Sequence, residues 1–162
     1  MGIDNNWCIC ACGQSIVNAD WDILPKKRIA VNFAVDYVKD YTHFAAVDKV
    51  DVSKFIDVDD CRIARIITSL ALRMHGDNYN AGDDVEVVDY DTAIGSLDMA
   101  VVFAINKGAT KITFVGVDGL GTTADGYDHK YLHDIDYVEW CKRVMGRCVQ
   151  LCRDGGCEIE YR

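Results

Sequence analysis

The chain has 162 residues and a mass of 18.1 kDa, which is the size of a single domain built around one hydrophobic core. Its 17 Lys and Arg residues are outnumbered by 26 Asp and Glu residues, and the formal net charge of -9 repels phosphate backbones and anionic membranes, so no nucleic-acid partner is expected. No apolar stretch approaches the roughly 18 residues of a membrane-spanning helix, and the first residues lack a basic segment followed by an apolar core, which predicts a cytoplasmic protein with no membrane span.

A series of short N-terminal segments alternates between the strand pattern and the helix pattern. Apolar and β-branched runs predict strands over residues 7–12, 28–31 and 43–47. The segments between them predict a helical turn over residues 20–24, which ends at the only proline of the chain, and a short helix over residues 33–39. Alternation of this kind is typical of a parallel sheet with helices on its faces.

The middle of the chain, residues 51–90, has a less regular pattern. Residues 61–67 are β-branched enough for a strand but also fit a helix, so both interpretations stay open. Residues 77–84 have the composition of a loop, and residues 85–88 predict a further strand.

The next predicted helix is buried against the sheet. Residues 97–107 are apolar nearly all round, which is the pattern of a helix covered on every side, with Ser96 as its N-cap and Gly108 after its last turn. A strand is expected directly afterwards, over residues 111–117.

A second helix and a last strand complete the predicted domain. Apolar residues recur at helical spacing over residues 134–152, and an Asp-Gly-Gly stretch separates this helix from a strand over residues 157–161. The elements together predict the α/β class: one Rossmann-like domain over residues 1–162, with a mostly parallel sheet and helices on both faces.

Eight cysteines are a large number for a chain of this length. Six of them form two sets that each share one face of a predicted strand or helix: Cys8, Cys10 and Cys12, and Cys141, Cys148 and Cys152. We interpret them as buried thiols that serve as small hydrophobic side chains. A zinc site typically uses Cys-x-x-Cys pairs, which the sequence lacks, and only the group Cys148, Cys152 and Cys157 stays open as an alternative.

Glycine and polar residues follow the predicted strands at their carboxyl ends, where parallel α/β sheets bind ligands. The residues that this rule selects, together with the start of the buried helix, are Gly13, Gln14, Ser15, Asn32, Asp48, Ser96 and Asp118. A glycine directly after a strand lets the backbone approach an anion, and we expect Gly13 to need a positive φ. Because the start of a helix also favours phosphate, these positions together predict a nucleotide site.

A long polar loop is predicted over residues 119–136, between a strand and a helix. Loops of this length in a compact domain are often lids or catalytic segments. The loop contains His129 and His133, which we interpret either as solvent-exposed side chains or as a general base, since the pKa of histidine lies near neutrality.

The same loop has an alternative use in metal chemistry. A divalent site, with Mg²⁺ as the expected ion beside a nucleotide, would draw on Asp118, Asp125, Asp128, His129 and His133. Two Asp-x-Asp stretches, at residues 57–59 and 89–91, are similar to the metal motif of other glycosyltransferases, but we interpret them as solvated turns because the chain is acidic throughout.

Several of these stretches resemble a known family. The segments CACGQSIVNADWDIL, RIAVNFAV and FAAVDK resemble the Rossmann-like family that contains the archaeal 6-hydroxymethylpterin diphosphokinases, in which Gly-Pro-Ser-Leu follows the first strand and Asn follows the second. The chain is also similar to the bacterial sialyltransferases that use CMP-activated sialic acid. Further on, IGSLDMAVVFAINKGATKITFVGVDG resembles a shared block in which Ser-Gly opens a helix and the next strand ends in Gly-(Ile/Phe/Val)-Asp.

The resemblance covers residues 8–48 and 94–140, with two departures. Gln14 stands where the family has proline, and Gly-Ser replaces Ser-Gly at the start of the helix. The resemblance implies that a nucleotide is held by Gly13, Gln14, Ser15, Asn32, Ser96 and Asp118, with Asp48 facing the same site. It also implies His129 or His133 as the general base, because the sialyltransferases carry a catalytic histidine in the corresponding loop.

Three functions are consistent with the sequence. The first is a nucleotide-binding transferase, most like a glycosyltransferase, that moves a sugar from a nucleotide-activated donor to a small-molecule or glycan acceptor. The second is a pterin-type diphosphokinase that uses ATP and Mg²⁺, and the third is a nucleotide-binding protein without catalytic activity. The base of the nucleotide, the acceptor, the metal dependence and the oligomeric state stay open, a homo-oligomer included.

Overall fold

The computed structural model describes residues 5–46, 64–68, 85–88, 95–117 and 135–162. Seven strands in these ranges form one sheet, in the order β5-β4-β3-β2-β1-β6-β7. All six pairings between neighbouring strands are parallel. The strands are β1 Asn6–Cys10, β2 Lys27–Val31, β3 His43–Ala45, β4 Ala64–Thr68, β5 Val85–Val88, β6 Lys111–Val115 and β7 Glu158–Tyr161.

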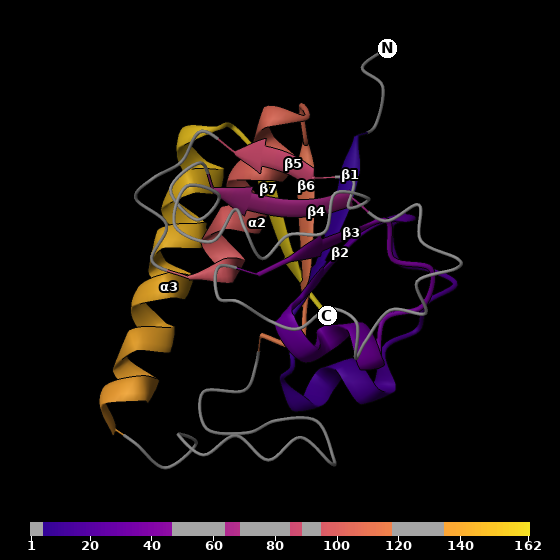
Figure 1. Ribbon diagram of the computed structural model, residues 1–162, viewed down its shortest axis with the longest axis horizontal. Helices are drawn as coiled ribbons and strands as arrows, with labels where there is room; N and C mark the ends of the chain where they lie inside the picture. Colours follow the sequence, from indigo (N-terminus) through magenta and orange to yellow (C-terminus); the bar gives the residue numbers. More distant parts are fainter. Residues whose placement is uncertain (1–4, 47–63, 69–84, 89–94, 118–134) are drawn as a thin grey trace.

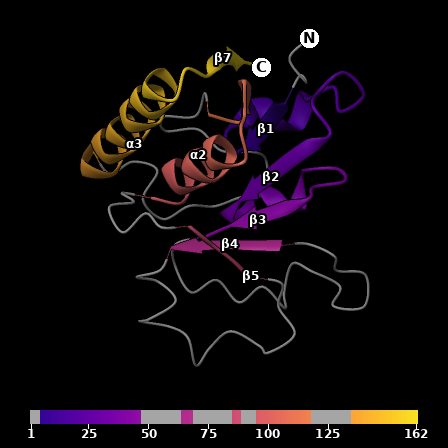
Figure 2. The ribbon, with the colours of Figure 1, turned by 90° about the horizontal axis from the view of Figure 1, so that it is seen from above.

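Helices cover both faces of the sheet, as Figure 2 shows. One face carries the α-helices α2, Ser96–Asn106, and α3, Ile135–Asp154, which pack against each other. The other face carries two short 3₁₀-helices, η1 at Gln14–Asn18 and η2 at Asn32–Asp36. The prediction of a Rossmann-like α/β domain with a parallel sheet is therefore confirmed.

Alternation along the central strands divides the core into two layers. In β1, Ile9 belongs to the layer under α2 and α3, whereas Cys8 and Cys10 belong to the layer under η1 and η2. In β6, Phe114 and Val115 are divided between the layers in the same way. Because successive side chains of a strand point to opposite faces, a strand covered on both sides has to be apolar at every position. This explains why the predicted strands are continuous apolar runs.

The two long helices match the sequence prediction, but the start of α2 differs from it. Its N-cap is Gly95 and not Ser96, which is the first residue of the helix. The Asp98 carboxylate, whose side chain is fully buried, accepts a hydrogen bond of 2.8 Å from the Gly95 N–H. The helix therefore begins one residue earlier than predicted, since an acidic residue three positions later satisfies the N-cap backbone.

The short elements were harder to predict. The segment at 21–24 is a turn, as expected, but the 3₁₀-helix η1 before it has no counterpart in the prediction, and the short helix expected over residues 33–39 is the 3₁₀-helix η2. The ambiguous segment at 61–67 contributes a strand, β4. The loop expected at 77–84 lies outside the described residues.

A buried arginine donates hydrogen bonds to the backbone of the two loops that contain η1 and η2. Arg28, which is 1% exposed, donates from Nε to the Pro25 carbonyl at 2.9 Å and from Nη1 to the Lys39 carbonyl at 2.6 Å, and Nη2 donates to the Trp21 carbonyl. The guanidinium carbon also lies 5.2 Å from the centroid of the Trp21 ring. Three backbone carbonyls from two loops are thus tied to one side chain of β2.

Within the described part of the chain, no helix is long and apolar enough to cross a membrane.

Candidate functional site

The strand order places a topological switch point between β1 and β6. From β1 the chain builds the sheet outward through β2 to β5, whereas β6 lies on the other side of β1 and continues to β7. In open α/β sheets, ligands bind in the crevice outside the carboxyl ends of the strands at such a point. The segments that leave β1 and β6 here begin with residues 11–15 and 116–117.

The backbones leaving β1 and β6 cross in close contact. The Ala11 N–H donates to the Val115 carbonyl at 2.8 Å, and the Gly13 N–H donates to the Gly116 carbonyl at 2.6 Å. Gly116 has a φ of +70°, and a Cβ placed on it would lie 2.0 Å from the Ala11 carbonyl oxygen. Glycine is therefore required at position 116 for two reasons, its backbone conformation and the space available.

The prediction that Gly13 needs a positive φ is wrong. Gly13 has φ −68° and ψ 160°, which is ordinary extended backbone. Its N–H is bonded to the Gly116 carbonyl in this structure, so this group does not serve as a donor to an anion. The positive φ that the sequence analysis assigned to Gly13 belongs to Gly116 instead. Gly116 is the glycine that directly follows β6.

Ser15 joins the ends of β1, β6 and β7. Its hydroxyl oxygen accepts a hydrogen bond of 3.1 Å from the Gly116 N–H and donates one of 3.4 Å to the Arg162 carbonyl. Gln14, beside it, is half-buried. Three of the predicted site residues, Gly13, Gln14 and Ser15, therefore do lie at the switch point, although the serine binds backbone rather than standing open to a ligand.

Asn32 and Ser96 meet at the same edge of the sheet. Asn32 directly follows β2, and its φ of 50° is in the left-handed region, which asparagine tolerates better than most residues. The Ser96 hydroxyl donates to Asn32 Oδ1 at 3.1 Å. This bond joins residues 64 positions apart and brings the start of α2 to the carboxyl end of β2. Because the amide oxygen is used, the NH₂ group is the donor that Asn32 can offer to a ligand.

The sequence analysis did not select Arg162, whose backbone lies at this edge. Its N–H donates to the Phe114 carbonyl at 2.9 Å, which continues the pairing of β7 with β6. Its guanidinium forms an ion pair with Glu160 and its side chain is 56% exposed. A hydrogen bond from Lys111, with help from Arg162, holds the pKa of the Glu160 carboxyl below its ordinary value. This placement can be found only from the folded structure, because it depends on the pairing of β7 with β6.

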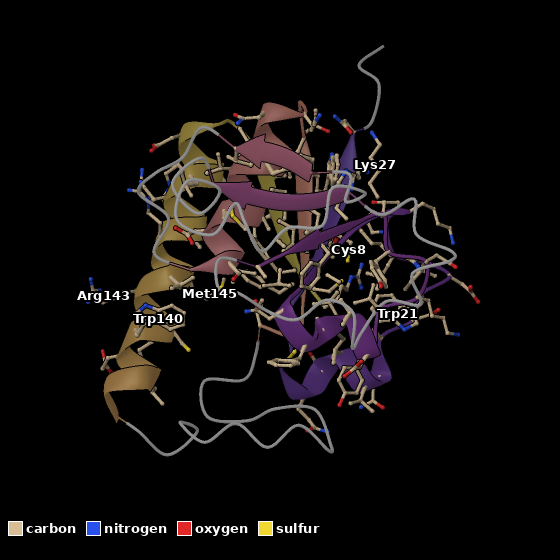
Figure 3. All side chains as sticks on the ribbon, viewed as in Figure 1. Cys8, Trp21, Lys27, Trp140, Arg143 and Met145 are labelled. Carbon is tan, nitrogen blue, oxygen red and sulfur yellow. The ribbon has the colours of Figure 1, made fainter. Side chains whose placement is uncertain are left out.

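Trp140 of α3 was also missed, and it lies against the start of α2 (Figure 3). A Cβ on Gly95 would lie 3.0 Å from Cζ2 and 3.1 Å from Cη2 of the indole. Trp140 is 36% exposed, and it precedes the buried Val144 by one helical turn, on the face of α3 that packs against α2.

Four predicted site residues lie outside the described residues: Asp48, Asp118, His129 and His133. The other proposed metal ligands, Asp125 and Asp128, and both Asp-x-Asp stretches also lie there. Their roles stay predictions. Among the residues that the structure describes, no group of three or more His, Cys, Asp or Glu side chains is arranged to hold a metal ion, so Cys148, Cys152 and Cys157 do not form the zinc site left open by the sequence.

Five of the seven described cysteines are buried, and Cys12 and Cys141 are half-buried. No disulfide joins the seven in this part of the chain, and Cys8 Sγ lies 3.4 Å from Cys10 Sγ inside the core. Burial raises the pKa of the Cys12 thiol to about 12 and, together with neighbouring Cys157, that of Cys152 to about 12. The hydrogen bond between Cys8 and Cys10, with burial, raises the pKa of the Cys10 thiol well above its ordinary value. Protonated thiols are poor nucleophiles and metal ligands.

These features define the class of the protein as a Rossmann-like α/β domain with its switch point between β1 and β6. No protein-family model matches the sequence, and no curated protein matches it. Two solved structures of the sialyltransferase CST-II are similar in fold. One is a variant in complex with CMP, with a TM-score of 0.64 and 12% identity, and the match covers 96% of this chain and 80% of that chain.

The second structure is CST-II in complex with a trisaccharide acceptor and CMP, with a TM-score of 0.63, 11% identity and the same coverage, 96% of this chain and 80% of that one. At this level of identity the likeness establishes the fold and no more. It supports the sialyltransferase side of the resemblance seen in the sequence. The diphosphokinase side has no support from these structures and stays a prediction.

Proposed function

We propose that the protein is a nucleotide-binding transferase of the glycosyltransferase type, which uses a nucleotide-activated sugar as donor, and that the nucleotide binds at the switch point. The observation that carries this proposal is the hydrogen bond between Ser96 and Asn32, which assembles the end of β2 and the start of α2 beside the β1–β6 crossing. The CMP complexes of CST-II, a protein of the same fold, make a CMP-linked sugar the first donor to test.

The side chains at this edge suit a nucleoside monophosphate. Asn32 and Gln14 carry amide NH₂ donors, and neither group has a hydrogen-bond partner of its own among the described residues. Arg162 adds a guanidinium, which binds phosphate in a chain whose net charge would otherwise repel it. Amide donors suit the ribose hydroxyls and the phosphate oxygens, and the cation suits the phosphate charge.

The chemistry of transfer is assigned in this proposal to the segment that the sequence predicts as a loop, residues 119–136. Either His129 or His133 takes the proton from an acceptor hydroxyl as that hydroxyl attacks the activated donor carbon, and the nucleotide leaves with its phosphate. Asp48 and Asp118 complete the nucleotide site in this proposal. Mg²⁺ is given no role in this step, and the metal dependence stays open.

The first experiment measures ligand binding by thermal shift with CMP, CDP, UDP, GDP and ATP, each with and without Mg²⁺. CMP at a hundredfold excess over its dissociation constant should stabilise the fold by about 2.7 kcal/mol. Asp57→Ala and Asp89→Ala, from the two Asp-x-Asp stretches, serve as matched controls and should keep the full shift. The proposal fails if no nucleotide raises the Tm, and a response to ATP with Mg²⁺ alone, abolished by EDTA, would favour the diphosphokinase.

The second experiment measures release of CMP from CMP-sialic acid with a lactoside acceptor. His129→Ala or His133→Ala, whichever is the base, should lower turnover roughly 10²- to 10⁴-fold and leave CMP affinity nearly unchanged. Full turnover in both variants would exclude a loop histidine as base. A protein that binds CMP tightly and returns every donor unchanged would be a binding protein without catalysis.

A further inference from the structure

Strand β7 is an edge strand of the described sheet. It pairs with β6 on one side, and in Figure 2 it is the outermost strand, at the end of the sheet opposite to β5. The N–H groups of Glu158 and Arg162 each donate a hydrogen bond of 2.9 Å to a backbone carbonyl of the segment that contains β6. Because the backbone groups of successive residues in a strand point to opposite sides, those of Ile159 and Tyr161 point away from β6. They have no partner among the residues that the structure describes.

The side chains of β7 are divided between the two faces of the sheet. Ile159 is half-buried against the core layer under α2 and α3, and Tyr161 beside it is 54% exposed. Glu158, Glu160 and Arg162 alternate with them and share the other face. An edge that combines unpaired backbone groups with exposed apolar side chains is a template for another strand.

We infer that β7 pairs with β7 of a second copy of this chain, antiparallel and about a twofold axis, so that two sheets become one. Only residues whose backbone groups point outward can form hydrogen-bonded pairs across such an interface. Ile159 opposite Tyr161 of the second copy forms two such pairs, one on each side of the axis, and brings Glu158 opposite Arg162. Ile159 opposite Ile159 would bring Glu158 opposite Glu160, and Tyr161 opposite Tyr161 would leave Ile159 outside β7 of the second copy. The first register is therefore the self-complementary one.

The charges at this interface are complementary in that register. Glu158 is exposed, forms no ion pair with a described residue, and meets Arg162 of the second copy. Glu160 faces Glu160 on the twofold axis, but each of these carboxylates lies 2.6 Å from Nζ of Lys111 and is paired with Arg162 in its own chain. The Arg162 guanidinium has five N–H donors, so this pairing and the phosphate contact proposed above do not exclude each other.

The first experiment measures self-association by sedimentation equilibrium over a roughly thousandfold range of protein concentration. A strand this short buries a small area, so we expect a weak, reversible dimer. Glu158→Arg replaces attraction to Arg162 by repulsion and should raise the Kd of the dimer by about 10-fold or more. Asp22→Arg makes the same change of net charge at an exposed residue outside β7 and should leave the Kd unchanged. Circular dichroism checks that both variants fold.

The second experiment tests the register by disulfide cross-linking. The two Glu160 residues would form a non-hydrogen-bonded pair with Cα atoms about 4.5 Å apart, which a disulfide can span. The two Glu158 residues would lie four positions out of register, about 13 Å apart, which a disulfide cannot span. Under mild oxidation with diamide, Glu160→Cys should form a covalent dimer on a non-reducing gel. Glu158→Cys, at the more exposed position, should form none above the level of the unchanged protein.

Three outcomes would overturn the inference. The first is an unchanged protein that sediments as a monomer at every concentration. The second is a dimer whose Kd is the same in Glu158→Arg as in Asp22→Arg, because such a dimer would use another surface. The third is cross-linking of Glu158→Cys as readily as Glu160→Cys, which the proposed register does not allow.

Discussion

Where the backbones leaving β1 and β6 cross, position 116 has no room for the side chain of alanine. Gly116 combines a left-handed backbone with a hypothetical Cβ only 2.0 Å from a carbonyl oxygen, which no side-chain movement can relieve. We expect Gly116→Ala to lower the free energy of unfolding by about 3 kcal/mol or more. Urea denaturation followed by circular dichroism measures this loss.

Gly146 provides the matched control for that substitution. It lies within α3, and a Cβ there would have nothing within 4 Å. Gly146→Ala should therefore stabilise the protein by roughly 0.5–1 kcal/mol, because alanine restricts the unfolded chain and favours the helix. A cost below 1 kcal/mol for Gly116→Ala would mean that the two backbones separate easily, contrary to the geometry described above.

Asn32 separates backbone strain from ligand binding. Its φ of 50° costs an ordinary residue free energy that glycine does not incur, so Asn32→Gly should keep the fold while it removes the amide. CMP affinity should fall by about 3- to 10-fold through the lost hydrogen bonds. Asp40, exposed and with a φ of 48°, is the control, since Asp40→Gly relieves the same strain and should leave affinity unchanged. Equal affinity of CMP for both variants would remove Asn32 from the site.

These residues also indicate how far a sequence can locate a site. Asn32 and Ser96 were selected because they follow a strand or begin a helix, and the structure brings their side chains within 3.1 Å. Gly13 was selected by the same rule, but the conformation expected for it belongs to Gly116. Whether a residue follows a strand can be recognised from the local sequence. The backbone φ of a residue where two strands cross depends on which strand lies beside it, and the local sequence does not identify that strand.

At the scale of elements, the two loops that carry η1 and η2 depend on Arg28. Its three bonds reach backbone carbonyls in a planar fork that an ammonium group cannot reproduce. Arg28→Lys should leave at least one buried carbonyl unsatisfied and cost about 2–4 kcal/mol of unfolding free energy. The matched control is Arg143→Lys on the exposed side of α3, which should change stability by less than about 0.5 kcal/mol. Similar small effects of both substitutions would show that Arg28 does not fasten the loops.

The elements that were predicted well are the two long α-helices, both located to within two residues at every end. In α3 apolar residues recur at helical spacing over twenty residues, and in α2 a nearly continuous apolar segment of eleven residues, 97–107, is followed by glycine. The 3₁₀-helices extend over five residues each, too few for a period to be recognised. The segment at 61–67 stayed ambiguous because a short β-branched run fits a buried strand and a buried helix equally, and only pairing with β3 and β5 decides between them.

At the scale of the whole molecule, the site is assembled from segments that are far apart in the sequence. Residues 13–15, 116 and 162 meet because β6 lies beside β1 and β7 lies beside β6, whereas residues 32 and 96 meet because α2 starts at the carboxyl end of β2. No local pattern encodes that strand order: the alternation of elements predicted a parallel sheet with helices on its faces, but not the order of its strands. The positions of Trp140 and Arg162 follow from the assembled fold, so they could not have been predicted from the sequence alone.

Buried thiols give the whole domain a pH dependence on the alkaline side. Burial raises the pKa of Cys12 from about 9 to about 12, and that of Cys152 likewise to about 12, while unfolded thiols ionise at their ordinary value. A group whose pKa is raised in the folded state contributes stability that is fully present below about pH 9 and is lost as the pH rises toward 12. The free energy of unfolding should therefore fall by about 1 kcal/mol per buried thiol between pH 7 and pH 10.

Urea denaturation at pH 7 and at pH 10 tests this with Cys12→Ala. In this variant the free energy of unfolding should fall by about 1 kcal/mol less between the two pH values than in the unchanged protein, because the ionisation of other groups cancels in the comparison. Parallel pH dependences of the two proteins would mean that the Cys12 thiol ionises as readily in the folded protein as in the unfolded one.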